Sequence, residues 1–540
     1  MVAGAPDTRA SAADMIVLGA IVLLSLLLYV SALGLYSDDW VFLGILHRSP
    51  DQSLPGLMQA LHQGDFALRQ RPVQILYLAM GYKLFGFEPL GYHLVNASAL
   101  LIAVLALYAV LRELALPRAL ALAVPAVYAT MPNFATDRFW MAAHQATLSI
   151  TLVVAGAYCA LRGLRAIGLR SFVALEAAAA CCFVLSGLAY EVALPLLAPL
   201  AVILAVRARR LGLAGPRQAV AVAAALLPLA AVVLFKAAAT NRVGVDQAYP
   251  EYLASLAGGA ARVNLGAYGI GLPYVLWWIA RHALDPAALA AGAGVGALAG
   301  ASVWRAWSSE ARSRAPRLLA AGALVFVLGY AVFVVPTAGI SFSSASLANR
   351  LAIAAALGVA AAVAGLLAWA LPRRAFAVAV GTFCGAACIV TNTLARFWES
   401  AYREQQRIVA GMTSALPDLP AGATVVIDGV CLERGGAYVF TGKRDVTGVL
   451  QVRYTAPGVR GSAITNPPRI GEQGIMVFTL REPDLLRYRP ALIVYDASRR
   501  RAYRLRSRRQ ALAYFRGSNF VPRRDCLPGF AWRGPAPKTD

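Results

Sequence analysis

Charged residues are scarce in this chain: they make up 14% of its 540 residues, while hydrophobic residues make up 59%. A soluble globular protein carries about 25% charged residues. The composition therefore excludes an ordinary soluble domain and predicts a polytopic membrane protein. Acids are rarer still, 27 against 50 basic residues, for a net charge of +23. Because most of the basic residues fall in short gaps between apolar runs, we expect membrane lipids, and no nucleic acid, as partners.

Cysteine and histidine are also few, with 7 and 5 residues. Five cysteines lie in apolar segments, where they are interpreted as small core residues. Cys431 and Cys526 are the two in the C-terminal region, and in an oxidising compartment we expect them to form a disulfide bond. The spacing of the cysteines and histidines matches no metal-binding motif, so no histidine-based metal site is predicted.

Eleven apolar stretches are about long enough to span a bilayer. They cover residues 14–35, 92–112, 117–134, 140–161, 171–189, 192–206, 218–238, 286–304, 318–336, 347–370 and 375–395. Arginines fill alternate gaps and most acids fill the others, which predicts a cytoplasmic N-terminus and an extracytoplasmic C-terminal region. The first stretch is too long, and lacks the small-residue cleavage site, to be a simple signal peptide, so it is interpreted as a retained helix.

One further apolar stretch, residues 262–283, is broken by Gly269, Gly271 and Pro273 and is rich in aromatic residues. If it crossed the membrane, the arginine-rich gap between residues 305 and 317 would lie outside, against the charge rule. The stretch is therefore interpreted as a re-entrant or interfacial helix.

The predicted fold is an all-α polytopic membrane bundle of about eleven transmembrane helices with a small C-terminal α+β or β-rich extracytoplasmic domain. The transmembrane domain would span residues 1–395, with long external loops at 36–91 and 239–285, and the soluble domain residues 396–540. In the first loop we expect short helices at 38–48 and 54–62 and an interfacial helix at 71–86. In the soluble domain we expect an amphipathic helix at 396–416 and strands at 423–430, 474–480 and 491–497, the last followed by a return strand.

Polar residues recur at the external ends of the predicted helices. Asp38 and Asp39 follow the first apolar stretch, where two acids at the water interface suit general-base or metal chemistry on a substrate from the bilayer. A cap of helix 38–48 is the alternative for Asp38. The cations proposed to bind a phosphate are Arg350, Arg71, Lys83, Arg138 and Arg242, and the alternative for each is a headgroup anchor. The residues proposed to line an acceptor site or the cavity wall are Glu191, Asp137, His144, Tyr77 and Asn349.

Four segments in order resemble the GT-C superfamily of integral-membrane glycosyltransferases, and more narrowly its protein O-mannosyltransferase-like and aminoarabinose-transferase-like branch. They are LYSDDWVFL (35–43), RPVQILYLAMGYKLFGFEPLGYHLVNASAL (71–100), LAYEVALPLLAPL (188–200) and SLANRLAIAAA (346–356). The resemblance covers about residues 14–395. It does not extend to the C-terminal region, which matches no module that we can name. The chain also carries Asp-Asp where the mannosyltransferases carry Asp-Glu.

The resemblance implies an inverting hexosyl- or pentosyltransferase that moves a sugar from a polyprenyl-phosphate donor to an acceptor hydroxyl. Asp38 would be the base, and Asp39 would orient the acceptor, shape the site or help to hold a divalent metal ion. No cofactor is certain, and the acceptor is a glycan, lipid or protein. The expected location is the bacterial inner membrane. A transporter or flippase of lipid-linked saccharides and a non-catalytic envelope assembly protein are the alternatives.

Overall fold

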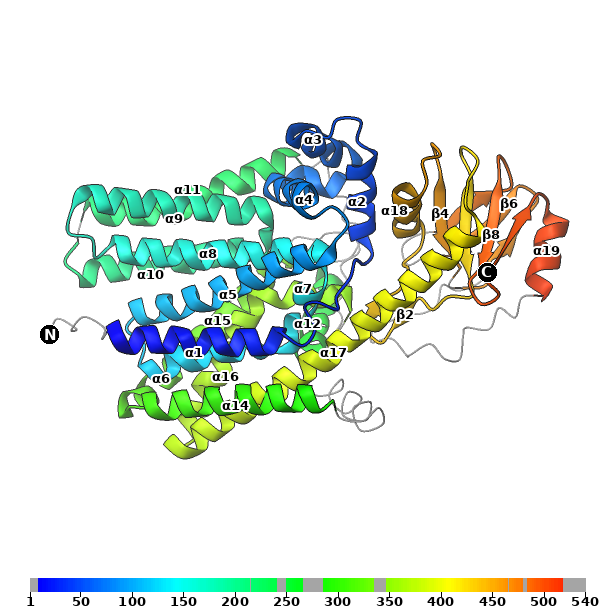
Figure 1. The fold of residues 1–540 in the computed structure, drawn as a ribbon. Helices are drawn as coiled ribbons and strands as arrows, with labels where there is room; N and C mark the ends of the chain where they lie inside the picture. Colours follow the sequence, from blue (N-terminus) through cyan, green and yellow to red (C-terminus); the bar gives the residue numbers. More distant parts are fainter. Residues whose placement is uncertain are drawn as a thin grey trace.

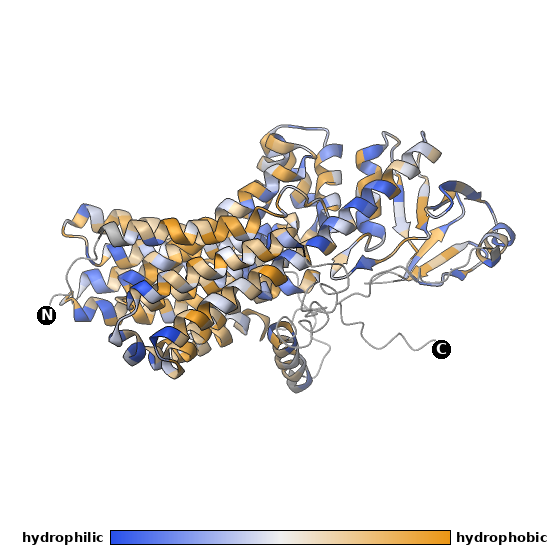
Figure 2. Ribbon diagram, turned by 60° about the horizontal axis from the view of Figure 1, so that its bottom comes forward, coloured by the Kyte–Doolittle hydropathy of each residue, from blue (hydrophilic) through white to orange (hydrophobic). Residues whose placement is uncertain are grey.

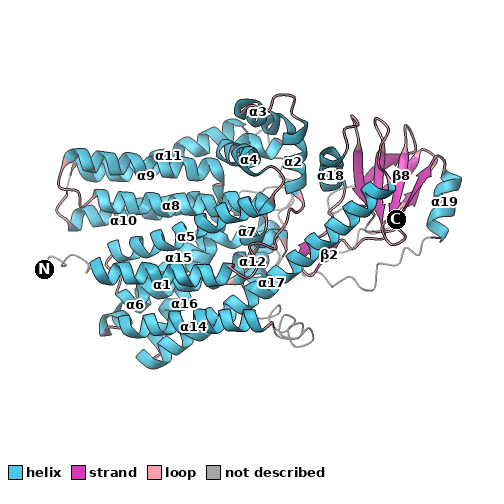
Figure 3. Cartoon of the chain, viewed as in Figure 1, coloured by secondary structure: helices cyan, strands magenta, loops and turns pink. Residues whose placement is uncertain are grey.

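The computed structural model describes residues 8–213, 215–239, 249–265, 285–334, 346–464, 466–478 and 483–517. It consists of a long helical bundle joined at one end to a region that contains the strands (Figures 1 and 3). The bundle contains α1 (Thr8–Leu26), α5 (Pro89–Glu113), α6 (Arg118–Thr130), α8 (His144–Gly163), α9 (Leu169–Ala189), α10 (Leu197–Arg210), α11 (Pro216–Ala239), α14 (Pro286–Ala306), α15 (Ser309–Ala331), α16 (Ile353–Ala370) and α17 (Arg373–Ala415).

These helices confirm the predicted membrane bundle. Within the described ranges, nine helices are long and apolar enough to cross a membrane, and the shorter apolar segments Ser11–Leu26 and Arg118–Thr130 coincide with the other two predicted spans. The first span differs from its prediction, because α1 ends at Leu26 and the chain continues in turns to residue 32. Hydrophobic residues follow the length of the bundle, and hydrophilic ones gather at the N-terminal end and in the C-terminal region (Figure 2).

Glycines let two helix pairs approach closely. A Cβ atom on Gly296 of α14 would lie 2.8 Å from the carbonyl oxygen of Gly381 of α17, and one on Gly292 would lie 2.9 Å from that of Gly385. Gly322 of α15 and Gly358 of α16 meet in the same way. Small residues spaced four apart are typical of helix contacts in membranes, where van der Waals packing replaces the hydrophobic effect.

The loop predicted to be the first external one forms three helices close to their predicted positions: α2 (Asp38–Arg48), α3 (Leu54–Gly64) and α4 (Pro72–Phe85). Ser53 caps α3, and Pro72 opens α4 at a position where a missing N–H costs nothing. A connector of short segments joins α6 to α8: η2 (Pro132–Phe134), α7 (Thr136–Phe139) and η3 (Met141–Ala143). The remaining helical elements among the described residues of this part are η1 (Phe66–Gln70), η4 (Glu191–Leu196), η6 (Val332–Val334), η7 (Leu347–Ala352) and α12 (Tyr249–Leu265). Most of the segment interpreted as re-entrant, residues 266–283, lies outside the described residues.

Helix α17 is the structural link to the C-terminal region. The last predicted span and the predicted amphipathic helix 396–416 form one continuous helix of 43 residues, which leaves the bundle and ends beside the strands (Figure 1). Its buried outer part includes Trp398, Gln405 and Met412.

The strands of the C-terminal region form a mixed sheet in the order β4-β1-β8-β9. The strands β4 (Arg460–Ala463), β1 (Thr424–Asp428) and β8 (Leu492–Asp496) are parallel, and β9 (Arg501–Leu505) is antiparallel to β8. Smaller sheets pair β2 (Glu433–Arg434) with β3 (Ala437–Tyr438), and β5 (Arg469–Ile470) with β6 (Gly474–Phe478) and β7 (Pro483–Arg487). Helix α18 (Lys443–Arg453) packs on β4, and α19 (Arg508–Gly517) follows β9. This confirms the predicted strand-containing C-terminal region.

Candidate functional site

The two acids that open α2 differ in their surroundings. Asp39 is fully buried: its Oδ2 accepts a hydrogen bond from the Tyr36 N–H at 2.8 Å, and its Oδ1 accepts one from the Ala142 N–H at 2.7 Å. Asp38 is half-exposed and forms no hydrogen bond or ion pair with any residue that the structure describes. Asp39 therefore ties α2 to η3, and Asp38 keeps a carboxylate available.

The backbone before Asp38 is strained. Ser37 has φ +45°, a conformation that residues other than glycine rarely adopt, and its side chain does not cap α2. Asp38 is the first helical residue, so it is not the N-cap residue that the alternative interpretation required. Burial raises the pKa of the Asp39 carboxyl well above its usual range, although the hydrogen bonds from Tyr36 and Ala142 act to lower it. Backbone strain such as the positive φ of Ser37 is often found at functional sites.

Trp140 links the chain before Asp38 to Arg350. Its Nε1 donates to the Tyr36 carbonyl oxygen at 2.9 Å, and the Arg350 guanidinium lies 4.8 Å from the centre of its ring. Arg350 donates to the Leu347 carbonyl oxygen at 3.0 Å and forms no ion pair with a carboxylate of the described ranges. The tryptophan therefore holds this cation on the same side of the bundle as the acidic pair, without neutralising it.

Asp137 and Asn349 also belong to this group. The Asn349 Oδ1 accepts from the Thr136 N–H at 3.1 Å, and its Nδ2 donates to the Asn133 carbonyl oxygen at 2.8 Å, which fixes η7 against the connector. Asp137 is fully buried, and neither carboxylate oxygen has a hydrogen-bond partner among the described residues. Burial raises the pKa of its carboxyl well above the usual range, while the charges of Arg350 and Arg138 act to lower it.

His144 and Tyr77 approach from α8 and α4. The Tyr77 hydroxyl and the His144 Nδ1 are 3.1 Å apart, and the His144 ring centre is 5.5 Å from that of His93. The His93 Nε2 donates to the Gly34 carbonyl oxygen at 3.0 Å. Burial, followed by the nearby charge of Asp39, raises the pKa of Tyr77. His93 thus contacts the segment that precedes α2, and His144 packs against His93.

Arg71 and Glu191 form a separate cluster with Lys236. The Arg71 Nη2 and Nε atoms donate to the two Glu191 oxygens at 2.6 and 3.2 Å, and the Lys236 Nζ lies 3.0 Å from Glu191 Oε2. The Arg71 guanidinium is stacked 4.6 Å from the centre of the Tyr190 ring. Two cations therefore share one carboxylate in this half-buried cluster.

The other predicted cations are placed differently. Arg138 is buried, donates to the Met131 carbonyl oxygen at 3.2 Å and lies 5.0 Å from the Phe134 ring centre, so it is directed into the connector. Lys83 is exposed and donates to the Gln52 carbonyl oxygen at 3.2 Å. Arg242 lies outside the described residues, as does Cys526, the predicted disulfide partner of the buried Cys431.

The structure therefore brings together Asp38, Asp39, Tyr77, Asp137, His144, Asn349 and Arg350 around the segment before α2 and the connector. No sequence pattern distinguishes Trp140, which joins two parts of this group. Its position in an apolar stretch made it indistinguishable from a core aromatic residue. No group of three or more His, Cys, Asp or Glu residues that could hold a metal ion is present in the described ranges.

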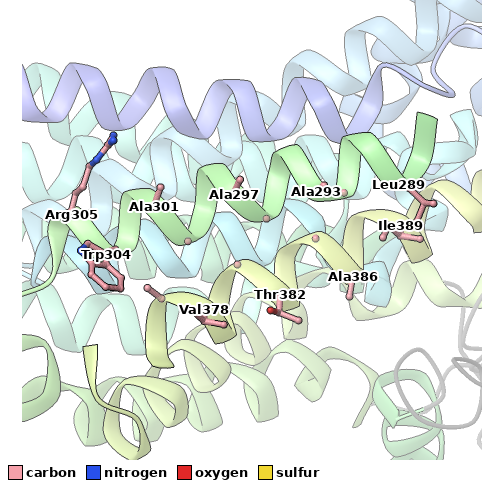
Figure 4. Close-up of a pocket in the computed structure, with 16 residues that line it drawn as sticks. Leu289, Ala293, Ala297, Ala301, Trp304, Arg305, Val378, Thr382, Ala386 and Ile389 are labelled. Carbon is pink, nitrogen blue, oxygen red and sulfur yellow. The ribbon is translucent and has the colours of Figure 1, made fainter. Parts of the chain in front are cut away.

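A large groove lies elsewhere. It has a volume of about 920 Å³ and runs between α14 and α17, lined mostly by alanines, glycines and aliphatic residues (Figure 4). Thr382, Trp304 and Arg305 are the lining residues with polar side-chain atoms, and none of the predicted site residues lines it. The groove follows the line along which the glycines of α14 and α17 meet. Its lining has no group suited to acid–base chemistry.

No protein-family model matches the sequence, and a comparison with curated proteins gives no match. Solved structures of GT-C glycosyltransferases resemble the chain at a distance. They include the Archaeoglobus fulgidus oligosaccharyltransferase tethered with an acceptor peptide (11% identity, 83% of this chain, 64% of that chain, TM-score 0.37). The same enzyme in complex with Zn and sulfate matches at 13% identity over 82% of this chain and 62% of that chain, with a TM-score of 0.39. ArnT from Cupriavidus metallidurans bound to undecaprenyl phosphate matches at 16% identity over 77% of this chain and 82% of that chain, with a TM-score of 0.32.

The chain thus spans slightly less than two thirds of the oligosaccharyltransferase chain. At these identities and TM-scores the likeness supports no conclusion about this chain's activity or about the role of any residue.

Proposed function

We propose that this protein is a membrane glycosyltransferase that moves a sugar from a polyprenyl-phosphate donor to an acceptor hydroxyl on the extracytoplasmic face. The observation that carries the proposal is the contrast at the start of α2. Asp38 keeps a half-exposed carboxylate free, while its neighbour Asp39 is buried and fixes the helix in place. A free carboxylate on a rigid support is what a general base requires.

In the proposed reaction, Asp38 takes the proton of the acceptor hydroxyl as the oxygen bonds to the anomeric carbon. The bond from that carbon to the phosphate oxygen breaks, and the lipid phosphate leaves with the electron pair. Attack from the side opposite the phosphate inverts the anomeric centre. The proposal covers a glycan, lipid or protein acceptor, and a hexose or a pentose as the transferred sugar.

Arg350 is the proposed phosphate ligand. Its guanidinium is held by Trp140 and is not paired with a carboxylate of the described ranges, so the donors other than the one that binds Leu347 are available to an anion. Arg71 is a second candidate, but Glu191 occupies two of its donors. Lys83 and Arg242 stay predictions, and Arg138 is directed into the connector. Asp137, His144, Tyr77 and Asn349 are proposed as the wall behind the acceptor.

A divalent metal ion is not needed to write this step. Both oxygens of Asp39 already accept backbone hydrogen bonds, which leaves Asp38 as the member of the pair with free oxygens. Asp38 would supply one carboxylate to a divalent cation, whose other ligands would be water and the donor phosphate. The proposed proton transfer depends on the Asp38 carboxylate with or without such an ion.

The first test is Asp38→Asn in purified protein supplied with a polyprenyl-phosphate sugar. Removal of a general base is expected to lower the rate of transfer about 10²- to 10⁴-fold. Glu88→Gln, an exposed acid of the same loop, is the matched control and should keep near-normal turnover. Turnover of Asp38→Asn at the rate of this control would reject the base.

The second test is Arg350→Ala. Loss of a charge-assisted hydrogen bond costs about 1.5–3 kcal/mol, so the apparent affinity for the donor should fall about 10- to 100-fold. Arg350→Lys should retain part of it, because lysine keeps the charge and loses the planar fork. Unchanged donor saturation in Arg350→Ala would argue against a phosphate role.

The same assay separates the rival functions. A flippase of lipid-linked saccharides would move the donor between leaflets of a vesicle without forming a glycosylated product. An envelope assembly protein would do neither and would instead retain other envelope proteins on purification. Product formation by the purified protein that depends on Asp38 would exclude both.

A further inference from the structure

Helix α2 is fixed at both ends, and the two anchors differ. At its first turn, Asp39 binds the backbone of Tyr36 and Ala142 in the bundle part of the molecule. At its last turn, Arg48 reaches across to the C-terminal region. The Arg48 Nε donates to the Gln451 carbonyl oxygen at 3.0 Å, and Nη1 donates to that of Thr455 at 2.8 Å. Nη2 donates to the carbonyl oxygens of Tyr454 and Ala456.

These four acceptors lie at and just beyond the end of α18. The last carbonyl groups of a helix have no partner within the helix, and the helix dipole makes that end attractive to a cation. The Arg48 side chain of α2 donates hydrogen bonds to carbonyls at the end of α18 and places a positive charge at the negative end of its dipole. The contact is specific in geometry, because one guanidinium donates to the Gln451 carbonyl of the last helical turn and to three carbonyls just beyond it.

The surface between the two helices is close-packed. A Cβ atom on Gly448 of α18 would lie 2.2 Å from the Trp40 carbonyl oxygen of α2. A Cβ on Gly44 of α2 would lie 3.0 Å from the Gly448 Cα. Two facing glycines thus let the helices touch along their backbones, and any added carbon would push them apart.

Two more contacts join the same parts. Arg444 at the start of α18 forms an ion pair with Asp65, which follows α3. Trp40 donates to the Gln405 Oε1 of α17 at 3.3 Å, and the Gln405 Nε2 donates to the Val439 carbonyl oxygen at 2.6 Å. The C-terminal region therefore contacts α2 along its length, from Trp40 to Arg48.

We propose that Arg48 is a positioning residue: through it, docking of α18 on α2 sets the orientation of α2 and thereby the placement of the Asp38 carboxylate. The C-terminal region would then be part of the reaction machinery without touching substrate. This inference rests on the proposed function, since it assigns a role to the support of the proposed base.

The test compares Arg48→Ala and Gly448→Ala, which disrupt the contact from opposite sides. Both are expected to lower kcat about tenfold or more with donor KM changed less than about twofold, because misplacing a reacting group by about 1 Å can cost 10²-fold in rate. Gly448→Ala carries the steric effect alone, since it leaves every charge in place. Arg48→Lys should recover part of the rate, because one ammonium can reach some of the carbonyls.

The controls are matched in type. Arg69→Ala removes another arginine of the same loop, which donates to the single carbonyl of His62, and Gly19→Ala adds a carbon where the nearest atom is 3.9 Å away. Both should keep wild-type kcat. Hydrogen exchange of α2 backbone amides, measured on the folded variants, should increase in Arg48→Ala and in Gly448→Ala and stay unchanged in the controls.

The outcomes separate the two claims. If Asp38→Asn abolishes transfer while Arg48→Ala and Gly448→Ala turn over normally, the positioning role is wrong and the proposed function stands. If Asp38→Asn is fully active, the proposed base is wrong regardless of Arg48. A fall in kcat without faster exchange in α2 would also overturn the positioning role, because the rate would then have changed with α2 still in place.

Discussion

Asp38 and Asp39 show how adjacent residues of one type acquire different roles. Successive residues of a helix point about 100° apart, so the first turn of α2 directs Asp39 into the protein and leaves Asp38 half-exposed. Asp39→Asn places an amide donor where a backbone N–H already donates, and a buried unsatisfied donor costs about 1–3 kcal/mol.

We expect Asp39→Asn to lower the midpoint of thermal unfolding of the purified protein, and Asp38→Asn to leave it unchanged. The two variants are controls for one another, because the chemical change is identical. A larger loss of stability in Asp38→Asn would mean that the roles assigned to the pair are reversed.

Asp445 provides a test of pH dependence. Burial raises the pKa of its carboxyl to about 6 from an ordinary value of 3.8, even though hydrogen bonds from Thr441, Gly442 and Val446 act to lower it. The folded protein therefore binds the proton of the Asp445 carboxyl more tightly than the unfolded chain does. The contribution of the protonated carboxyl to the free energy of unfolding is present at about pH 4, falls as the pH rises to about 6, and does not change further above that pH.

The stability of Asp445→Asn should lack this slope. The difference in unfolding free energy between the wild type and the variant should shrink, by up to about 3 kcal/mol, as the pH rises from about 4 to about 6. Melting curves of both proteins across this range would measure it through the gap between their midpoints. A gap that is constant with pH would contradict the raised pKa.

The sequence predicted the acidic pair and its cations as residue types at helix ends, and it could not assign their partners. Arg71 was proposed to bind a phosphate and Glu191 to line an acceptor site or the cavity wall, and the structure joins them in an ion pair across 120 residues. Long-range pairs of this kind depend on how the helices pack, and no local pattern encodes them.

At the scale of elements, the glycine contact between α14 and α17 can be tested within one helix. Gly296→Val would place a Cβ 2.8 Å from a backbone oxygen of α17, whereas Gly294→Val meets only a Leu24 methyl carbon at 3.8 Å. Both changes carry the same cost in helix propensity. We expect Gly296→Val to be less stable than Gly294→Val by about 1–3 kcal/mol, the usual cost of overpacking. Equal melting midpoints of the two variants would show that α14 and α17 can move apart at Gly296 without loss of stability.

The apolar helices and the more hydrophobic strands were predictable, because hydrophobic length and pattern decide them. Helices α18 and α19 were not. The sequence of α18, KRDVTGVLQVR, contains a glycine and four β-branched residues, which weaken helix propensity, and its helical form depends on packing against β4 and α2. The continuity of α17 was also missed, because the change from apolar to polar residues at about 395 resembles a boundary between two elements.

At the scale of the molecule, the arginine-rich loops and the C-terminal region lie at opposite ends of the bundle (Figures 1 and 2). The charge rule then predicts their sides. In a background without native cysteines, a membrane-impermeant maleimide should label Glu472→Cys in intact cells. Ile167→Cys, 99% exposed in the loop before α9, should react only after the cells are permeabilised. Labelling of residue 167 in intact cells would invert the topology and place Asp38 in the cytoplasm.

The unbroken α17 has a consequence for the lipid that surrounds the protein. A helix of 43 residues is about 65 Å long, so a change of about 5° in its tilt displaces one end relative to the other by about 6 Å. Helices tilt when the bilayer becomes thinner or thicker than their apolar length. Because α17 enters the C-terminal region as one unbroken helix and Trp40 of α2 donates to its Gln405, we expect a change in bilayer thickness to move the C-terminal region relative to α2. Acyl-chain length is therefore a variable to fix before rates measured in different membranes are compared.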